Sequence, residues 1–180
     1  AAQFLDNPQT LIMLAKVVKI HDWPETRKKL FNQTAKLLLQ EHNLIKRNKN
    51  PGSYSADDLF PIAGAIMAGR LISGVEGISL DTESNLADYP SFKTLTYIDA
   101  DRLQETLRRS LFINTSVENI VDYCHRTIAE FLAAHWIADQ VRNGLPIKRA
   151  LSLFGLDGYP TSELRGLNAW LTIFLPEHAE

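Results

Sequence analysis

The chain has 180 residues, 45% of them hydrophobic, and a formal net charge of −2. This is enough for one large domain or two small ones with a substantial core, and the weak charge argues against a nucleic-acid-binding surface. No apolar run reaches the roughly 20 residues of a membrane-spanning helix, and the single cysteine cannot form an internal disulfide, as is typical of cytoplasmic proteins. We therefore expect a cytoplasmic protein that makes no membrane contact. Without an initiator methionine or signal peptide, we expect a piece of a longer protein.

Three helices are predicted in the first part of the chain. The first spans residues 8–18 and opens with a proline, which is tolerated where a helix's first amide has no intrahelical partner. The second is amphipathic and spans residues 25–42. A polar segment, residues 46–53, is interpreted as a linker. The third helix is capped within residues 55–58 and is ended by Gly74 and Gly77.

The middle of the chain carries less regular signals. Residues 78–98 are expected to be irregular, with one short helix or strand. Residues 99–110 show helical periodicity. Two apolar runs, 111–113 and 120–123, flank a turn-like segment and predict a β-hairpin. A helix followed by a hairpin is the local plan of a winged-helix domain.

The last third of the chain is predicted to be helical. Residues 126–142 are apolar on most sides, and a helix of this kind is normally packed on several sides. Two further helices are expected within 146–154 and 162–175. The predicted fold class is therefore mainly α: a helical subdomain, then a winged-helix-like subdomain with a small β-hairpin, then further C-terminal helices.

A strand-to-helix corner is predicted within YCHRTIAEFLAA, residues 123–134. Thr127 and Glu130 have the spacing of a capping box, which would place His125 just outside the helix. The positive end of a helix disfavours protonation of a histidine there, so a neutral His125 imidazole could donate an N–H to a phosphate. Alternatively, His125 donates to a backbone carbonyl and is purely structural. From the residues alone, the structural interpretation is favoured.

Motifs for catalysis are absent from the sequence. There is no GxxxxGK[ST] loop and no GxGxxG after a strand. The five histidines and Cys124 lack metal-site spacing. Cys124 and His125 are adjacent and would point to opposite faces of a strand, which argues against a catalytic pair. We predict no catalytic residue, no metal site and no enzymatic activity for this chain alone.

Three segments together resemble the NACHT family of STAND nucleotide-binding switch proteins, in the right order. NPQTLIML, residues 7–14, resembles the NP-x-x-L-x-x-L opening of the family's first helical domain. Residues 23–39, beginning WPETRKKLF, resemble the LP-x-TR-x-x-LY…LL segment that follows it. Residues 123–134 resemble F-x-H-x-[ST]-x-x-E-[FY]-LAA, at the end of the winged-helix domain.

The resemblance implies a division into a helical domain (1–50), a winged-helix domain (51–126) and the start of a second helical domain (127–180). It implies that these domains form the lid over ADP or ATP bound to a P-loop core of the same protein. Pro8 would pack on adenine and His125 would contact the ADP phosphate. ATP exchange would open the lid and permit homo-oligomerisation, which would activate an unknown effector.

Two alternatives stay open on the sequence. A winged-helix DNA-binding regulator would need a basic recognition helix, and residues 99–110 carry Arg102, Arg108 and Arg109 together with acidic residues. A helical protein-interaction scaffold would need no nucleotide. A P-loop upstream in the parent gene would distinguish the nucleotide switch from the scaffold.

Overall fold

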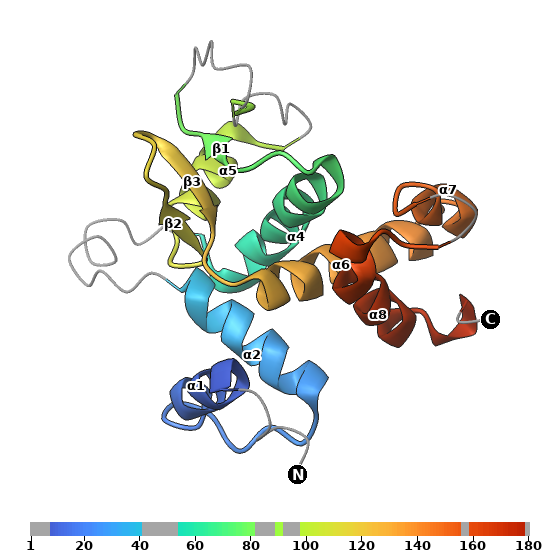
Figure 1. The fold of residues 1–180 in the computed structure, drawn as a ribbon. Helices are drawn as coiled ribbons and strands as arrows, with labels where there is room; N and C mark the ends of the chain where they lie inside the picture. The colour runs from blue at the N-terminus through green and yellow to red at the C-terminus, as the bar shows by residue number, and fades with distance from the viewer. Residues whose placement is uncertain (1–7, 41–53, 82–88, 92–97, 156–158, 179–180) are drawn as a thin grey trace.

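The computed structural model describes residues 8–40, 54–81, 89–91, 98–155 and 159–178 (Figure 1). This part of the chain is mainly helical and contains a small antiparallel sheet, so the predicted mainly α class is confirmed. Helices α1 and α2 lie at the bottom of Figure 1, the sheet at the upper left, and α7 and α8 at the right. None of the helices described is long and apolar enough to cross a membrane.

The two N-terminal helices are α1 (Pro8–Val17) and α2 (Arg27–Leu39). Thr26 caps α2, since its hydroxyl accepts the Lys29 N–H at 3.1 Å. The helix predicted for residues 25–42 is therefore too long at both ends: Gln40 is already extended, with ψ of 143°. The predicted linker, residues 46–53, lies outside the described residues.

Helix α4 (Ala56–Ser73) begins within the predicted cap and ends at the first of the two predicted glycines. The Ser55 hydroxyl accepts the Asp58 N–H at 3.2 Å, and the Asp58 carboxylate accepts the Ser55 N–H at 2.9 Å. These reciprocal bonds form a capping box. Gly74 ends the helix at φ of 70°, a left-handed conformation that glycine adopts without strain.

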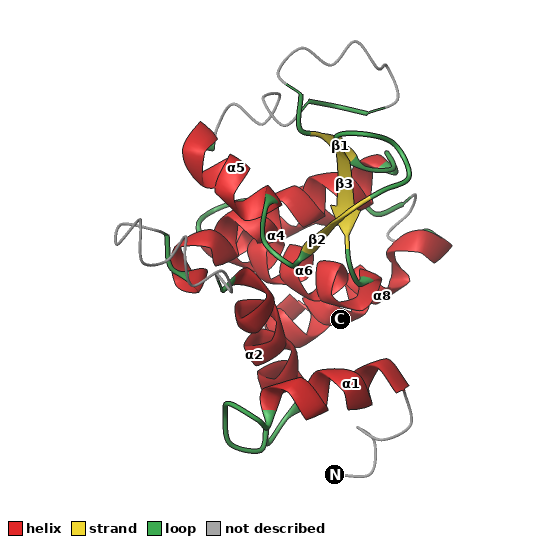
Figure 2. Cartoon of the chain, turned by 90° about the vertical axis from the view of Figure 1, so that its left-hand side faces the viewer, coloured by secondary structure: helices red, strands yellow, loops and turns green. Residues whose placement is uncertain are grey.

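The sheet contains β1 (Ile78–Ser79), β2 (Phe112–Asn114) and β3 (Ile120–Tyr123), in the order β1-β3-β2. The predicted hairpin is confirmed as β2–β3, and it follows helix α5 (Ala100–Leu107), which ends three residues earlier than predicted (Figure 2). Residues 78–98 are expected to hold one short helix or strand, and within their described part this element is the strand β1, which pairs antiparallel with β3.

Helix α6 (Arg126–Arg142) is the centre of the core and packs against α4, α2 and α8 (Arg165–Phe174). Its residues from Ile128 to Ala134 are all buried, as its apolar sequence predicts. Helix α4 crosses it closely at Gly64. The other C-terminal elements are α7 (Ile147–Leu151) and the 3₁₀ turns η3 (Ser162–Leu164) and η4 (Pro176–His178).

An aromatic cluster joins three of these helices. The Phe31 ring of α2 lies 4.9 Å from that of Trp170 in α8, and the Phe131 ring of α6 lies 5.1 Å from Trp170. One continuous core cluster contains residues from α1 through α8. The three-part division at residues 50 and 126 stays a prediction. Its second boundary, between residues 126 and 127, falls in the first turn of α6.

Candidate functional site

His125 occupies the corner between β3 and α6. It is the N-terminal cap residue of α6 and has extended backbone angles, φ −145° and ψ 118°. The Cys124 N–H donates to the Leu111 carbonyl at 2.9 Å, and the His125 carbonyl accepts from Ile128 and Ala129 at 3.1 Å each. The backbone on both sides of the imidazole is therefore fixed by hydrogen bonds.

The predicted capping box at this corner is wrong. Helix α6 starts at Arg126, so Thr127 is already its second residue and cannot cap it. The Thr127 hydroxyl is buried without a hydrogen-bond partner among the described residues. Glu130 instead accepts from Arg126 Nε at 3.1 Å and lies against α8, where a Cβ on Gly166 would come within 2.2 Å of its carboxylate. Glu130 thus lies where α6 and α8 approach each other closely.

The imidazole of His125 lines a cavity of about 210 Å³ between α1, α2 and the corner. Burial lowers the pKa of His125, and the nearby Lys16 ammonium lowers it further, so the ring is neutral at pH 7. Its side chain does not cap α6, and it has no hydrogen-bond partner among the described residues. The described part of the chain therefore contains no hydrogen bond from His125 to a backbone carbonyl, which the structural interpretation requires.

Pro8 lies at the first position of α1 and is exposed. Pro8, Ile12 and Lys16 recur every four residues and so follow one side of the helix. Ile12 and Lys16 line the cavity beside His125, but Pro8 is not among its lining residues. The two predicted nucleotide contacts thus lie on neighbouring elements, without sharing one cavity.

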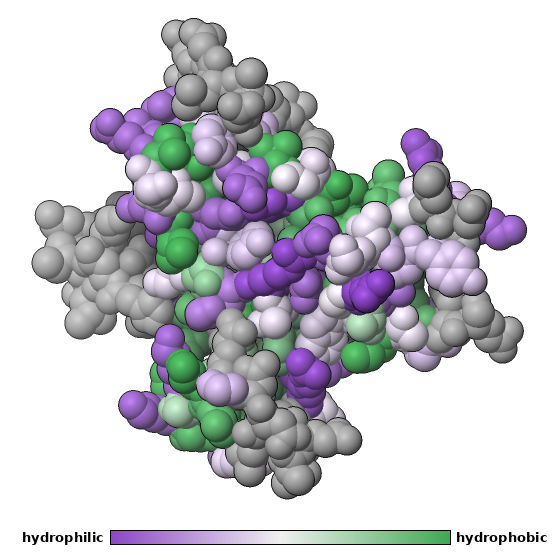
Figure 3. Space-filling view, viewed as in Figure 1, coloured by the Kyte–Doolittle hydropathy of each residue, from purple (hydrophilic) through white to green (hydrophobic). Residues whose placement is uncertain are grey.

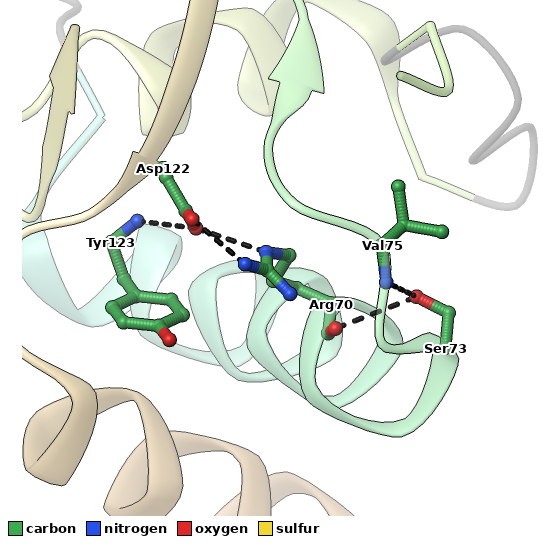
Figure 4. Close-up of polar contacts among 5 residues, drawn as sticks. All are labelled: Arg70, Ser73, Val75, Asp122 and Tyr123. Atoms are coloured by element: carbon green, nitrogen blue, oxygen red, sulfur yellow. Dashed lines mark hydrogen bonds and ion pairs between the residues drawn. The ribbon is translucent and has the colours of Figure 1, made fainter. Parts of the chain in front are cut away.

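An ion pair holds the strand that leads into this corner (Figure 4). Arg70 of α4 donates to both carboxylate oxygens of Asp122, at 3.0 and 2.8 Å, and Asp122 also accepts the Tyr123 N–H at 2.8 Å. The guanidinium lies over the Tyr123 ring, 5.3 Å from its centre. A bidentate pair of this kind is both strong and directional, so it fixes β3 against α4.

Sequence reasoning missed Lys16 and Arg70. Lys16 is one of many lysines on helix surfaces and is separated from His125 by most of the chain. Arg70 and Asp122 are 52 residues apart. Residues so far apart in the sequence form no local pattern, so only the fold could identify these pairs.

The described residues contain no group of three histidine, cysteine or acidic side chains that could hold a metal ion. Burial raises the pKa of the Cys124 thiol, which keeps it protonated and weakly nucleophilic at pH 7. No family model, curated protein or solved structure matches this chain. The interpretation of the corner therefore depends on the contacts above and on the three sequence segments.

Proposed function

We propose that this chain is the lid region of a NACHT-type, nucleotide-controlled signalling switch, in which His125 contacts the phosphate of ADP. The observation that carries the proposal is the His125 imidazole itself. It is neutral at pH 7, held at a rigid corner, and without a partner among the described residues. His125 is partly exposed, so its N–H is accessible to a ligand, and a phosphate oxygen would accept it.

The outward side of α1 supports a second part of the proposal, a contact with the P-loop core of the same protein. Large apolar side chains on α1 and the turn after it are 40–60% exposed (Figure 3): Leu11, Ile12, Val18, Ile20 and Trp23. The opposite side of α1 is also apolar and is buried on α2. Exposed apolar side chains gathered in this way normally mark a surface that contacts another protein or domain. Pro8 lies on the same outward side.

The mechanism follows from differential binding. A ligand shifts a two-state equilibrium only when it binds one state better than the other. In the closed state, ADP on the P-loop core would accept the His125 N–H and hold the lid down. Exchange for ATP would release this contact, expose the outward side of α1 and permit homo-oligomerisation.

The arginines of the α5 region are poorly placed for a DNA-binding role. Arg102 lies over the Tyr54 ring, 5.2 Å from its centre. Arg109 is buried and pairs with Glu105 at 2.8 Å. Two of the three basic side chains that a recognition helix would offer are thus engaged within the protein.

The sequence encoded upstream of residue 1 offers the first test: we expect a GxxxxGK[ST] loop there, and its absence would favour the helical scaffold. The second test is His125→Leu in the protein that contains this loop. Losing one hydrogen bond to a charged group costs about 1.5–3 kcal/mol, so ADP retention should fall by about 10- to 100-fold. Oligomers should then form without a trigger, as measured by light scattering after size-exclusion chromatography.

Lys148→Leu is the control, because Lys148 is an exposed residue of α7, away from α1 and the His125 corner (Figure 1). It should retain ADP and stay monomeric. If His125→Leu behaves like Lys148→Leu in both assays, the phosphate role of His125 is refuted.

A further inference from the structure

The cavity beside His125 has an apolar floor and a cationic rim. Met13, Leu37 and Thr34 are buried at its base, and Ile12 and Leu38 complete the wall. Lys16 and His125 complete the lining, and none of the described lining residues is acidic. A second hollow of about 460 Å³ adjoins it and shares Lys16, Leu37 and Leu38. The second hollow is lined in addition by Lys19, Ile20 and Ser110.

Few polar groups in this cavity can contact a ligand. The Thr34 hydroxyl donates its proton to the Leu30 carbonyl at 2.8 Å, so it has no proton to offer. Lys16 has no ion-pair partner among the described residues and is exposed. The donors that remain on the lining are therefore the Lys16 ammonium and the His125 N–H. Together they complement an anion.

We propose that Lys16 and His125 together form the binding site for a phosphate-bearing anion, with Lys16 as a second contact from α1. The inference rests on the proposed function for the identity of the physiological ligand. Lys16 supplies a full positive charge, whereas the neutral imidazole supplies one directed N–H. The apolar floor would pack against whatever uncharged group the phosphate carries.

This arrangement gives the anion a structural role as well as a signalling one. Helix α1 packs on α2, whereas His125 belongs to the corner of the winged-helix-like region. An anion that accepts from Lys16 and His125 at once therefore joins the helical subdomain to that corner. When the anion leaves, α1 is held only by its packing on α2. The bound phosphate therefore strengthens the attachment of α1 to the corner.

The test uses the 180-residue chain with inorganic pyrophosphate at pH 7, followed by NMR at the side chains of His125 and the cavity lining. We expect weak binding, on the order of 1–10 mM, with shifts at His125, Ile12 and Met13. Lys16→Met should raise the Kd about fivefold, which is the largest effect expected from the loss of one exposed ionic contact. Lys29→Met removes the same charge from α2, away from the cavity, and should change the Kd less than twofold.

A parallel titration with ADP distinguishes a nucleotide from a free phosphate, because packing on the apolar floor should make ADP bind more tightly.

Two results would overturn the inference. One is the absence of shifts at the cavity lining with 20 mM pyrophosphate, a concentration of about twice the weakest expected Kd. The other is equal affinity of Lys16→Met and Lys29→Met. If His125→Gln abolishes binding while Lys16→Met does not, Lys16 is excluded and the proposed role of His125 stands. If no P-loop lies upstream but pyrophosphate binds as expected, the proposed function fails and the anion site stands.

Discussion

Replacing Gly64 by alanine should destabilise the protein, although alanine is the better helix former. Gly64 lies in α4 where it crosses α6, and a Cβ there would come within 2.7 Å of Trp136 Cβ and 2.9 Å of the Leu132 carbonyl oxygen. Both atoms belong to or adjoin the α6 backbone, so neither can move without shifting the helix. Overpacking of this kind costs about 1–3 kcal/mol.

Gly69 of the same helix gives the matched control, because a Cβ there would meet nothing within 4 Å. Gly69→Ala should stabilise the protein by about 0.5–1 kcal/mol, the gain in helix propensity. Gly64→Ala combines that gain with the packing penalty, so we expect a net loss of about 1–2 kcal/mol.

Thermal unfolding followed by circular dichroism measures both variants. At this chain length each kcal/mol corresponds to about 2–4 °C in Tm, so Gly64→Ala should lower Tm by about 2–8 °C and Gly69→Ala should raise it slightly. Equal shifts in the two variants, or a stabilised Gly64→Ala, would refute the close crossing of α4 and α6.

Two further predictions concern ionisable groups. Asp122→Asn leaves the largely buried Arg70 without its ionic partner and should lower the free energy of unfolding in urea by about 3 kcal/mol. Lys36→Met breaks the ion pair of Lys36, whose side chain is 40% exposed, with Asp57 and should lower it by less than about 1 kcal/mol. Similar losses in the two variants would contradict the role of burial. Burial lowers the pKa of His135 despite its contact with Asp139, so the unfolded state takes up the proton first as pH falls below the ordinary histidine value of 6.5. Stability should therefore decline as the solution is acidified from pH 7, and His135→Phe should make the decline shallower; an unchanged pH slope would rule this out.

The local signals of the sequence predicted the secondary structure well. The capping residues of α4, the hairpin β2–β3 and the buried helix α6 all depend on residues a few positions apart. The prediction of the strand β1 was less definite, because its two residues carry no periodic pattern and are fixed by pairing with β3. Only the folded chain supplies that partner.

The site was harder to predict, since its contacts join distant segments. The error at Thr127 and Glu130 is instructive: the spacing fits a capping box, but Glu130 is also four residues after Arg126 and forms an ion pair with it. Local spacing alone does not choose between the two. The motif resemblance selected His125, but it gave no indication of the cavity or of Lys16.

The continuity of α6 has a mechanical consequence. Its 17 residues form an unbroken rod, about 25 Å long at 1.5 Å per residue. The His125 corner is at one end, and Arg142 at the other donates to the Phe174 carbonyl at the end of α8. Because its residues from Ile128 to Ala134 are all buried in the core, the helix cannot slide without opening that core. A tilt of the corner would instead move α6 and α8 together. A hinge between the corner and the C-terminal helices would therefore have to lie outside residues 126–142.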